Sequence, residues 1–389
     1  MDNISSVQLS TVETQKATKK EIPNKVAEVA KRVFQKIGEV LLFPVRFFGA
    51  KRWSIPGLLF RLPAVIGKHL LNRSDTSLEE DLFGSGYHNM NIPPLPQADT
   101  RHAIECASLA AAIHKSKSEW VEPFGIKPVD PRRFLGELVD EDRFLCNEKE
   151  GVLFDSQTAL KMGFYEKENT LYVVFGAIGS NVSEMPNEEE AIALKKKMEK
   201  MSVTSGLGGV PDCFDQADQL IQLIQSRAEG KQIHLTGQSL GAAVASYVAL
   251  KQHIPATALN CMAFGPGIQK KVGAKNLNQA NRFVTQVVTD GDWISHPPLA
   301  IRVASIFLDL IGIRTAGIFG KSYIIPHAKA YKTDRLLPSI LDIHRYILGN
   351  LLVHADPKAE KLAATIGDPK EFSNLFNEWL KQYPTINML

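Results

Sequence analysis

The chain has 389 residues, 44% of them hydrophobic, and a formal net charge of +3 at pH 7. A chain of this kind can bury a large core, in one sizeable domain with appendages or in two domains. Its four cysteines are far apart and form no C-x-x-C pair, which argues against a zinc site or a redox motif. Nothing in their spacing requires an oxidising compartment.

The positive charge is concentrated near the N-terminus. Residues 1–22 are rich in Ser, Thr, Gln and Lys and lack an apolar core, so we expect a disordered tail without an ordinary secretory signal peptide. Residues 23–73 contain ten Lys and Arg side chains and two Glu, whereas the rest of the chain is net negative. This split favours an anionic partner for the first seventy residues.

A helix is predicted from residue 23 to Pro44, and residues 43–71 mix aromatic with basic side chains. No run of about 18 uncharged apolar residues occurs there, so a membrane-spanning helix is not expected. We interpret residues 23–96 as a basic amphipathic extension that binds an anionic membrane surface through residues 23–73. The alternative is a helical arm packed on the next domain. Nucleic acid is not expected, because no known binding motif accompanies the charge.

The Pro-rich residues 91–100 mark a predicted domain boundary, and a helix is expected over residues 101–115. After a polar stretch to about residue 150, apolar runs predict strands that alternate with helices. Strands are predicted over residues 170–180, 231–236, 256–264 and 282–289, and helices over 211–228 and 240–253. This alternation predicts an α/β fold, a mostly parallel sheet flanked by helices, in a domain over residues 97–356. Residues 357–389 are expected to form a C-terminal helical segment.

The pentapeptide Gly237-Gln238-Ser239-Leu240-Gly241 fits the pattern G-x-S-x-G of a nucleophile elbow. It lies between a predicted apolar strand and a predicted helix, where a sharp turn needs small residues on both sides of the serine. At a helix N-terminus, free backbone N–H groups and the helix dipole favour a developing oxyanion. The alternative is that Ser239 is only a small residue between a strand and a helix.

Other segments carry a family resemblance. The segments LTGQSLGAAVA, VVFGAIGS, GGVPDCF, AFGPG, VVTDGDWISHPP and DIHRY occupy residues 235–245, 173–180, 208–214, 263–267, 287–298 and 342–346. Together they resemble the class 3, fungal-type lipases of the α/β-hydrolase superfamily, whose motifs stand in the same order along the chain.

The resemblance implies a catalytic triad of Ser239 as nucleophile, Asp292 as acid and His344 as base. It also implies an oxyanion hole made by the backbone N–H of Leu240 and one from Ile178 or the adjacent Ala177. Alternatives remain: Asp290 for the acid, and His296, His327 and His354 for the base. Ile178 stands where the family has Thr or Ser, so a hydroxyl is lost and low activity or an unusual substrate is expected.

Two segments are expected to cover the site. The charged residues 181–202 follow the oxyanion strand, where the family has its lid. The apolar residues 299–320 lie between Asp292 and His344 and either line an acyl-chain channel or form a helix packed in the core.

The sequence therefore predicts a serine-dependent lipase or phospholipase that cleaves a lipid carboxylester at a membrane surface through an acyl-enzyme. No metal or organic cofactor is expected. The alternatives are an acyltransferase with the same triad, or a catalytically silent hydrolase fold that binds a membrane or a protein. The protein is expected in the cytoplasm or at the periphery of a membrane. The alternative is a bacterial effector exported by a route that needs no secretory signal peptide. The oligomeric state is left open.

Overall fold

The computed structural model describes residues 92–176, 192–193, 196–197, 200–201, 204, 209–292, 294–295, 316–327, 347–365 and 369–382. The predicted tail, almost all of the predicted basic extension, most of the predicted lid and residues 299–315 lie outside the described residues.

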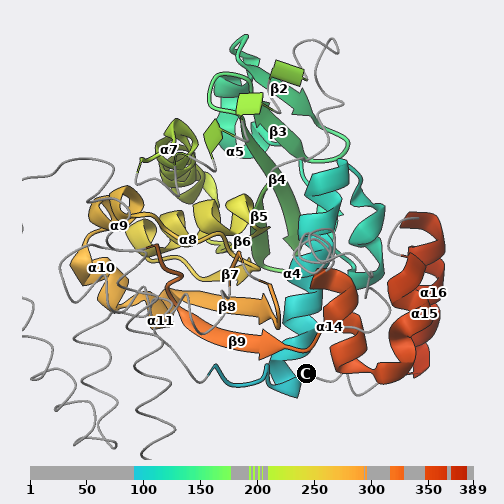
Figure 1. Ribbon diagram of the computed structural model, residues 1–389. Coiled ribbons are helices and arrows are strands. Elements are labelled where there is room, and N and C mark those ends of the chain that lie inside the picture. The colour runs from blue at the N-terminus through green and yellow to red at the C-terminus, as the bar shows by residue number, and fades with distance from the viewer. Residues whose placement is uncertain are drawn as a thin grey trace, which may run out of the picture. The chain divides into compact units, whose positions relative to one another are not determined.

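The described residues form a nine-stranded mixed sheet (Figure 1). Strands β2 to β9 lie side by side in chain order, and β1 pairs with β4. The pairings from β5 to β9 are parallel, and those among β1 to β5 are antiparallel. The strands are β1 (Lys127–Pro128), β2 (Phe144–Asn147), β3 (Val152–Asp155), β4 (Leu160–Lys167), β5 (Thr170–Phe175), β6 (Gln232–Gln238), β7 (Ala256–Leu259), β8 (Val284–Thr289) and β9 (Lys321–Ile325).

The predicted α/β fold, a largely parallel sheet flanked by helices, is confirmed, and the sheet is mixed because the pairings among β1 to β5 are antiparallel. Parallel neighbours need long crossovers, whereas β2 to β5 are joined by short turns that allow only antiparallel pairing. In the turn after β3, the Asp155 carboxylate accepts hydrogen bonds from the backbone N–H groups of Gln157, at 2.8 Å, and Thr158, at 3.2 Å. Glu168 adopts a φ of 54° in the turn between β4 and β5. Both turns lie between residues 116 and 169, where the sequence analysis predicted no strand.

Helices cover both faces of the sheet (Figure 1). On one face, α7 and α8 pack against inward-facing residues of β5 and β6 such as Val173 and Leu235. On the other face, α4 and α14 pack against the alternate residues, such as Tyr172 and Val174. The helices are α4 (Gln97–Lys115), α5 (Arg132–Leu135), α7 (Asp212–Arg227), α8 (Leu240–Gln252), α9 (Pro266–Val272), α10 (Ala274–Asn278), α11 (Ala280–Phe283), α14 (Ile347–Ala355), α15 (Glu360–Ala364) and α16 (Pro369–Gln382), with short 3₁₀ helices η1 (Ser118–Trp120), η2 (Glu122–Phe124), η3 (Gly136–Asp140) and η5 (Pro357–Ala359).

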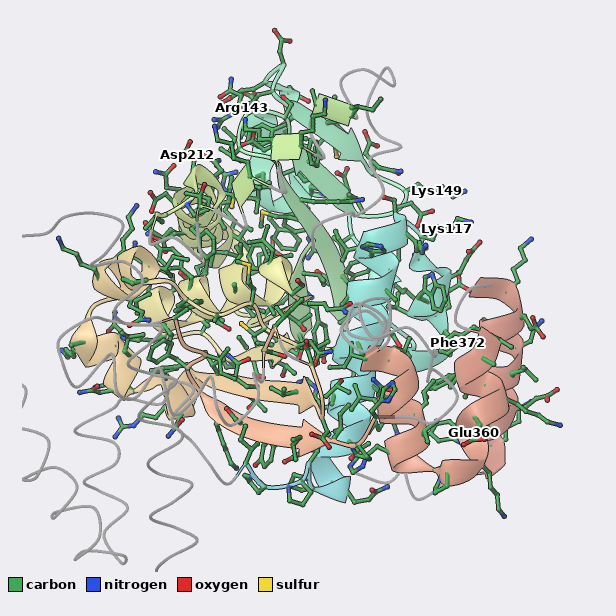
Figure 2. All side chains as sticks on the ribbon, in the orientation of Figure 1. Lys117, Arg143, Lys149, Asp212, Glu360 and Phe372 are labelled. Atoms are coloured by element: carbon green, nitrogen blue, oxygen red, sulfur yellow. The ribbon has the colours of Figure 1, made fainter. Side chains whose placement is uncertain are left out.

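An aromatic cluster attaches α16 to the rest of the described structure. Phe372, labelled in Figure 2, lies with its ring centroid 5.0 Å from that of Trp120 in η1. Phe376 is 4.8 Å from Phe124 in η2 by the same measure. The indole Nε1 of Trp379 donates a 3.0 Å hydrogen bond to the carboxylate of Asp356. Large buried aromatic side chains of this kind dominate packing energies, so the C-terminal helix is part of the core on the α4 face.

No helix among the described residues combines the length and the apolar character that crossing a membrane requires.

Candidate active site

Ser239 lies in a sharp turn between the end of β6 and the start of α8. Its backbone has φ 58° and ψ −121°, a conformation that L residues rarely adopt and that costs about 1–3 kcal/mol. Three backbone hydrogen bonds stabilise it. The N–H of Ser239 donates to the Leu259 carbonyl at 3.1 Å, and the Ser239 carbonyl accepts from the N–H groups of Met262 and Ala243, both at 3.1 Å. The surrounding structure thus holds the serine in the geometry of a nucleophile elbow.

The two glycines of the pentapeptide let the backbones on either side of Ser239 approach each other. A Cβ atom on Gly241 would lie 2.1 Å from the carbonyl oxygen of Phe175, at the end of β5. A Cβ atom on Gly237 would lie 2.5 Å from the carbonyl carbon of Gly241. Both distances are far below van der Waals contact, so the turn requires glycine at both positions.

The turn places Ser239 at the N-terminus of α8. The first N–H groups of an α-helix have no partner within the helix, and the dipole is positive at this end. Leu240, the first residue of α8, is buried, and its backbone N–H is the predicted donor to an oxyanion. The other predicted donors, Ala177 and Ile178, lie outside the described residues, directly after Gly176 at the end of β5.

Asp292 follows β8 at the same edge of the sheet, because the carboxyl ends of parallel strands coincide. It is fully buried, whereas Asp290 is exposed. The Asp292 carboxylate accepts a 3.0 Å hydrogen bond from the backbone N–H of Ile294 and another from the hydroxyl of Ser295. Burying a carboxyl group is costly unless it is hydrogen-bonded, and these two hydrogen bonds offset that cost.

Buried polar contacts connect the strand ends between Ser239 and Asp292. Strand β7 separates β6 from β8, which places these ends roughly 10 Å apart. Asn260, at the end of β7, accepts a 2.8 Å hydrogen bond from the N–H of Thr289 through its side-chain oxygen. The backbone N–H of Asn260 donates to the Val287 carbonyl at 2.9 Å. The side chain of Asn350 in α14 donates to the Thr289 hydroxyl at 3.4 Å.

The predicted base, His344, lies outside the described residues, as does its alternative His296. His327 is described and follows β9 by two residues. His354, in α14, has its Nε2 atom 3.2 Å from the carbonyl oxygen of Leu95. The described residues therefore bring Ser239 and Asp292 to one edge of the sheet, and the assignment of the base stays a prediction.

A surface pocket of about 600 Å³ lies near β2 and is lined by Arg132, by residues 139–142 and by residues 144–148. None of the predicted catalytic residues lines it, so it has no part in the candidate active site.

A second group of reactive side chains was missed in the sequence. The ligand atoms of His102 and Cys106 in α4 and of His234 in β6 all lie within 4.8 Å of one another. Within the described part of the chain, this is the one group of three such residues with the spacing to hold a metal ion. The signal for it is the spacing of four residues between His102 and Cys106, which places both on one face of a helix.

Comparison with known proteins gives a family match. Residues 174–301 match the family model described as lipase (class 3). Solved structures with detectable similarity include a deletion mutant of the Rhizomucor miehei lipase propeptide complex, at 11% identity over 68% of this chain and 81% of that one, with a TM-score of 0.35. A lipase from Rhizopus microsporus var. chinensis is 14% identical over 53% of this chain and 71% of that one, with a TM-score of 0.30. These structural similarities are too low to carry an argument about function. No curated protein matches the chain.

The glycine requirement is testable by stability. We expect Gly241→Ala to lower the free energy of unfolding by more than about 3 kcal/mol, because its methyl group meets the Phe175 carbonyl. Gly230→Ala is the control: its φ is also positive, at 80°, but its Cβ would meet nothing within 4 Å. Urea denaturation of both variants measures the difference. Equal losses for the two would contradict the close approach of α8 to β5.

Proposed function

Because residues 174–301 belong to the class 3 lipase family, we propose that the chain is a serine-dependent lipid ester hydrolase that works through an acyl-enzyme. Family membership itself indicates a carboxylic ester hydrolase. The observation that carries the finer proposal is the conformation of Ser239, held at a φ of 58° between β6 and the N-terminus of α8. Such strain persists only where the surrounding structure imposes it, and it clusters at active sites.

In the proposed first step, the Ser239 Oγ atom attacks the carbonyl carbon of the ester while His344 accepts the hydroxyl proton. Asp292 orients the imidazole and stabilises its positive charge. The negative charge on the former carbonyl oxygen is stabilised by the N–H of Leu240 and by one from Ile178 or Ala177. The tetrahedral intermediate then collapses, the C–O bond to the alcohol breaks, and His344 returns the proton to the departing alcohol.

In the second step, His344 takes a proton from water, and the hydroxide attacks the acyl-enzyme. The bond between the acyl carbon and Ser239 Oγ breaks, Oγ regains the proton, and a carboxylic acid is released. An acyltransferase would differ only here, because an alcohol would replace water. Product analysis with and without an added alcohol acceptor distinguishes the two.

The burial of Asp292 supports its choice over Asp290. A carboxylate that must stabilise an imidazolium acts more strongly away from water, where charge interactions are less screened. Asp292 is fully buried and accepts hydrogen bonds, whereas Asp290 is exposed.

We expect Ser239→Ala to lower kcat for a short-chain p-nitrophenyl ester by about 10⁴-fold or more, because the nucleophile is lost. The same substitution should abolish labelling by a fluorophosphonate probe. Ser226→Ala is the matched control, since its hydroxyl is bonded to the Leu223 carbonyl on the exposed side of α7. If the folded, unmodified chain is not labelled and hydrolyses no ester, the result would favour the alternative of a catalytically silent hydrolase fold that binds a membrane or a protein.

The choice of acid has its own test. We expect Asp292→Asn to lower kcat by roughly 10³–10⁴-fold, because the histidine loses its orienting charge. Asp290→Asn should change kcat less than about threefold, since its carboxylate is exposed to water. Initial rates on the same ester compare the two variants, and a larger loss for Asp290→Asn would reverse the assignment.

The positive charge of residues 23–73 indicates the kind of surface on which the substrate lies. Residues 23–73 carry ten Lys and Arg side chains against two Glu, and their aromatic residues can enter the headgroup boundary of a bilayer. Basic side chains near an anionic membrane contribute about 1 kcal/mol each. We therefore propose that the site of action is a phospholipid surface rather than a neutral oil droplet. The protein would be cytoplasmic or bound at the periphery of a membrane.

Replacing Arg46, Lys51, Arg52 and Arg61 by Gln should weaken binding to anionic vesicles by at least tenfold, because each loses about 1 kcal/mol of attraction. The control replaces four exposed lysines of the catalytic domain by Gln: Lys117 and Lys149, both labelled in Figure 2, with Lys127 and Lys275. Vesicle flotation measures binding. Equal binding by both variants would contradict the proposed role of the basic segment.

A further inference from the structure

His102, Cys106 and His234 meet where α4 crosses the sheet. His102 and Cys106 lie one turn apart in α4. His234 lies in β6, and its side chain faces this helix. The two Nε2 atoms are 3.2 Å apart, and the Cys106 Sγ atom is 3.6 Å from the Nε2 of His102. Thr257, on β7, places its hydroxyl oxygen 3.3 Å from the Nε2 of His102 and 3.1 Å from that of His234.

The cluster brings together more polar atoms than hydrogen bonding alone can use. A ring nitrogen of histidine either donates one hydrogen or accepts at one lone pair. The Nε2 of His102 nevertheless has three neighbours within hydrogen-bond distance: a nitrogen, a sulfur and an oxygen. In any protonation state this nitrogen has one hydrogen or one lone pair, so it cannot form a full hydrogen bond with all three neighbours. A cation at the centre satisfies the two nitrogens and the sulfur at once.

The spacing of these atoms suits zinc. In tetrahedral zinc sites the metal lies about 2.0–2.1 Å from a histidine nitrogen and about 2.3 Å from a cysteine sulfur. A tetrahedron with those bond lengths separates two nitrogens by about 3.3 Å and a nitrogen from the sulfur by about 3.6 Å. The His102 Nε2 atom lies 3.2 Å from the His234 Nε2 atom and 3.6 Å from the Cys106 Sγ atom, and the third pair, His234 and Cys106, lies within 4.8 Å.

We propose that His102, Cys106 and His234 bind one zinc ion, with the fourth position, next to the Thr257 hydroxyl, taken by that oxygen or by water. The ion would join helix α4 to strand β6 beneath it. Its role is structural, since His234 precedes Ser239 by five residues along the strand, which is about 16 Å, and faces the α4 side of the sheet rather than the α8 side.

The first test uses the unmodified full chain, purified without an oligohistidine tag and stripped with a chelator. Zn²⁺ is added back, and bound metal is counted by mass spectrometry after gel filtration. We expect one zinc per chain and a higher midpoint of thermal unfolding with zinc. Co²⁺ in place of zinc should give the absorption bands of a tetrahedral cobalt thiolate, and zinc should displace them. A chain that binds no zinc and gives no thiolate-to-cobalt band overturns the proposal.

The second test assigns the ligands. Cys106→Ala and His234→Ala should each weaken zinc binding by at least 100-fold and, for Cys106→Ala, remove the thiolate-to-cobalt band. Cys213→Ala and His253→Ala are matched controls, since Cys213 is buried elsewhere and His253 contacts Asn276 at the surface. Unchanged zinc affinity in Cys106→Ala overturns the site, as does tight binding of Cu²⁺ alone. If Cys106→Ala does not fold, the cobalt band of the unmodified chain still decides. Ester hydrolysis is not read, so failure here leaves the proposed function intact.

Discussion

The close contact between the N-terminus of α8 and the ends of β5 and β6 is the constraint on which the candidate active site depends. Gly241 brings the helix against the Phe175 carbonyl, and Gly237 makes room for the helix within the turn. With no space between the two backbones, the one residue left to span the turn, Ser239, must take a positive φ. The same contact aims the first N–H groups of α8 at the carboxyl edge of the sheet. Because β7 and β8 end at that edge as well, the buried Asp292 lies near it, where its backbone N–H donates to the Thr289 carbonyl and its carboxylate accepts from the Ile294 N–H.

Strands β5 to β8 of the parallel half could be predicted because they contain short apolar runs, such as Leu171 to Phe175, and because helices alternate with them. The last parallel strand, β9, was not predicted. The antiparallel strands could not be predicted, because their buried positions include charged residues. Lys161 in β4 is fully buried, and its ammonium group donates a 2.5 Å hydrogen bond to the Ser116 hydroxyl. Asp155 is buried as well, where it shapes a turn. In a sequence, such residues indicate a surface loop, and only the tertiary partner explains their burial.

At the candidate site, the pentapeptide predicted the turn at Ser239 only together with the strand and the helix predicted on either side of it, because a sharp turn between them needs small residues around the serine. The choice between Asp290 and Asp292 was not local, since it depends on which side chain turns inward. His344 and the second oxyanion donor remain expectations from the family resemblance. The expectation that no metal binds came from the spacing of cysteines alone. That criterion cannot detect His102 and Cys106 on one helix face, with His234 supplied from 132 residues beyond His102 by the packing of α4 on the sheet.

The aromatic contact beneath α16 gives the protein a built-in optical reporter. Two of its four tryptophans lie at this contact: Trp120 in η1 packs on Phe372 of α16, and Trp379 in α16 packs on Phe376. Both are almost completely shielded from solvent. Undocking of the last helix would expose both indoles to water together, and their fluorescence would shift to longer wavelengths. Detachment of the C-terminal helix can therefore be followed without an attached dye, separately from ester turnover.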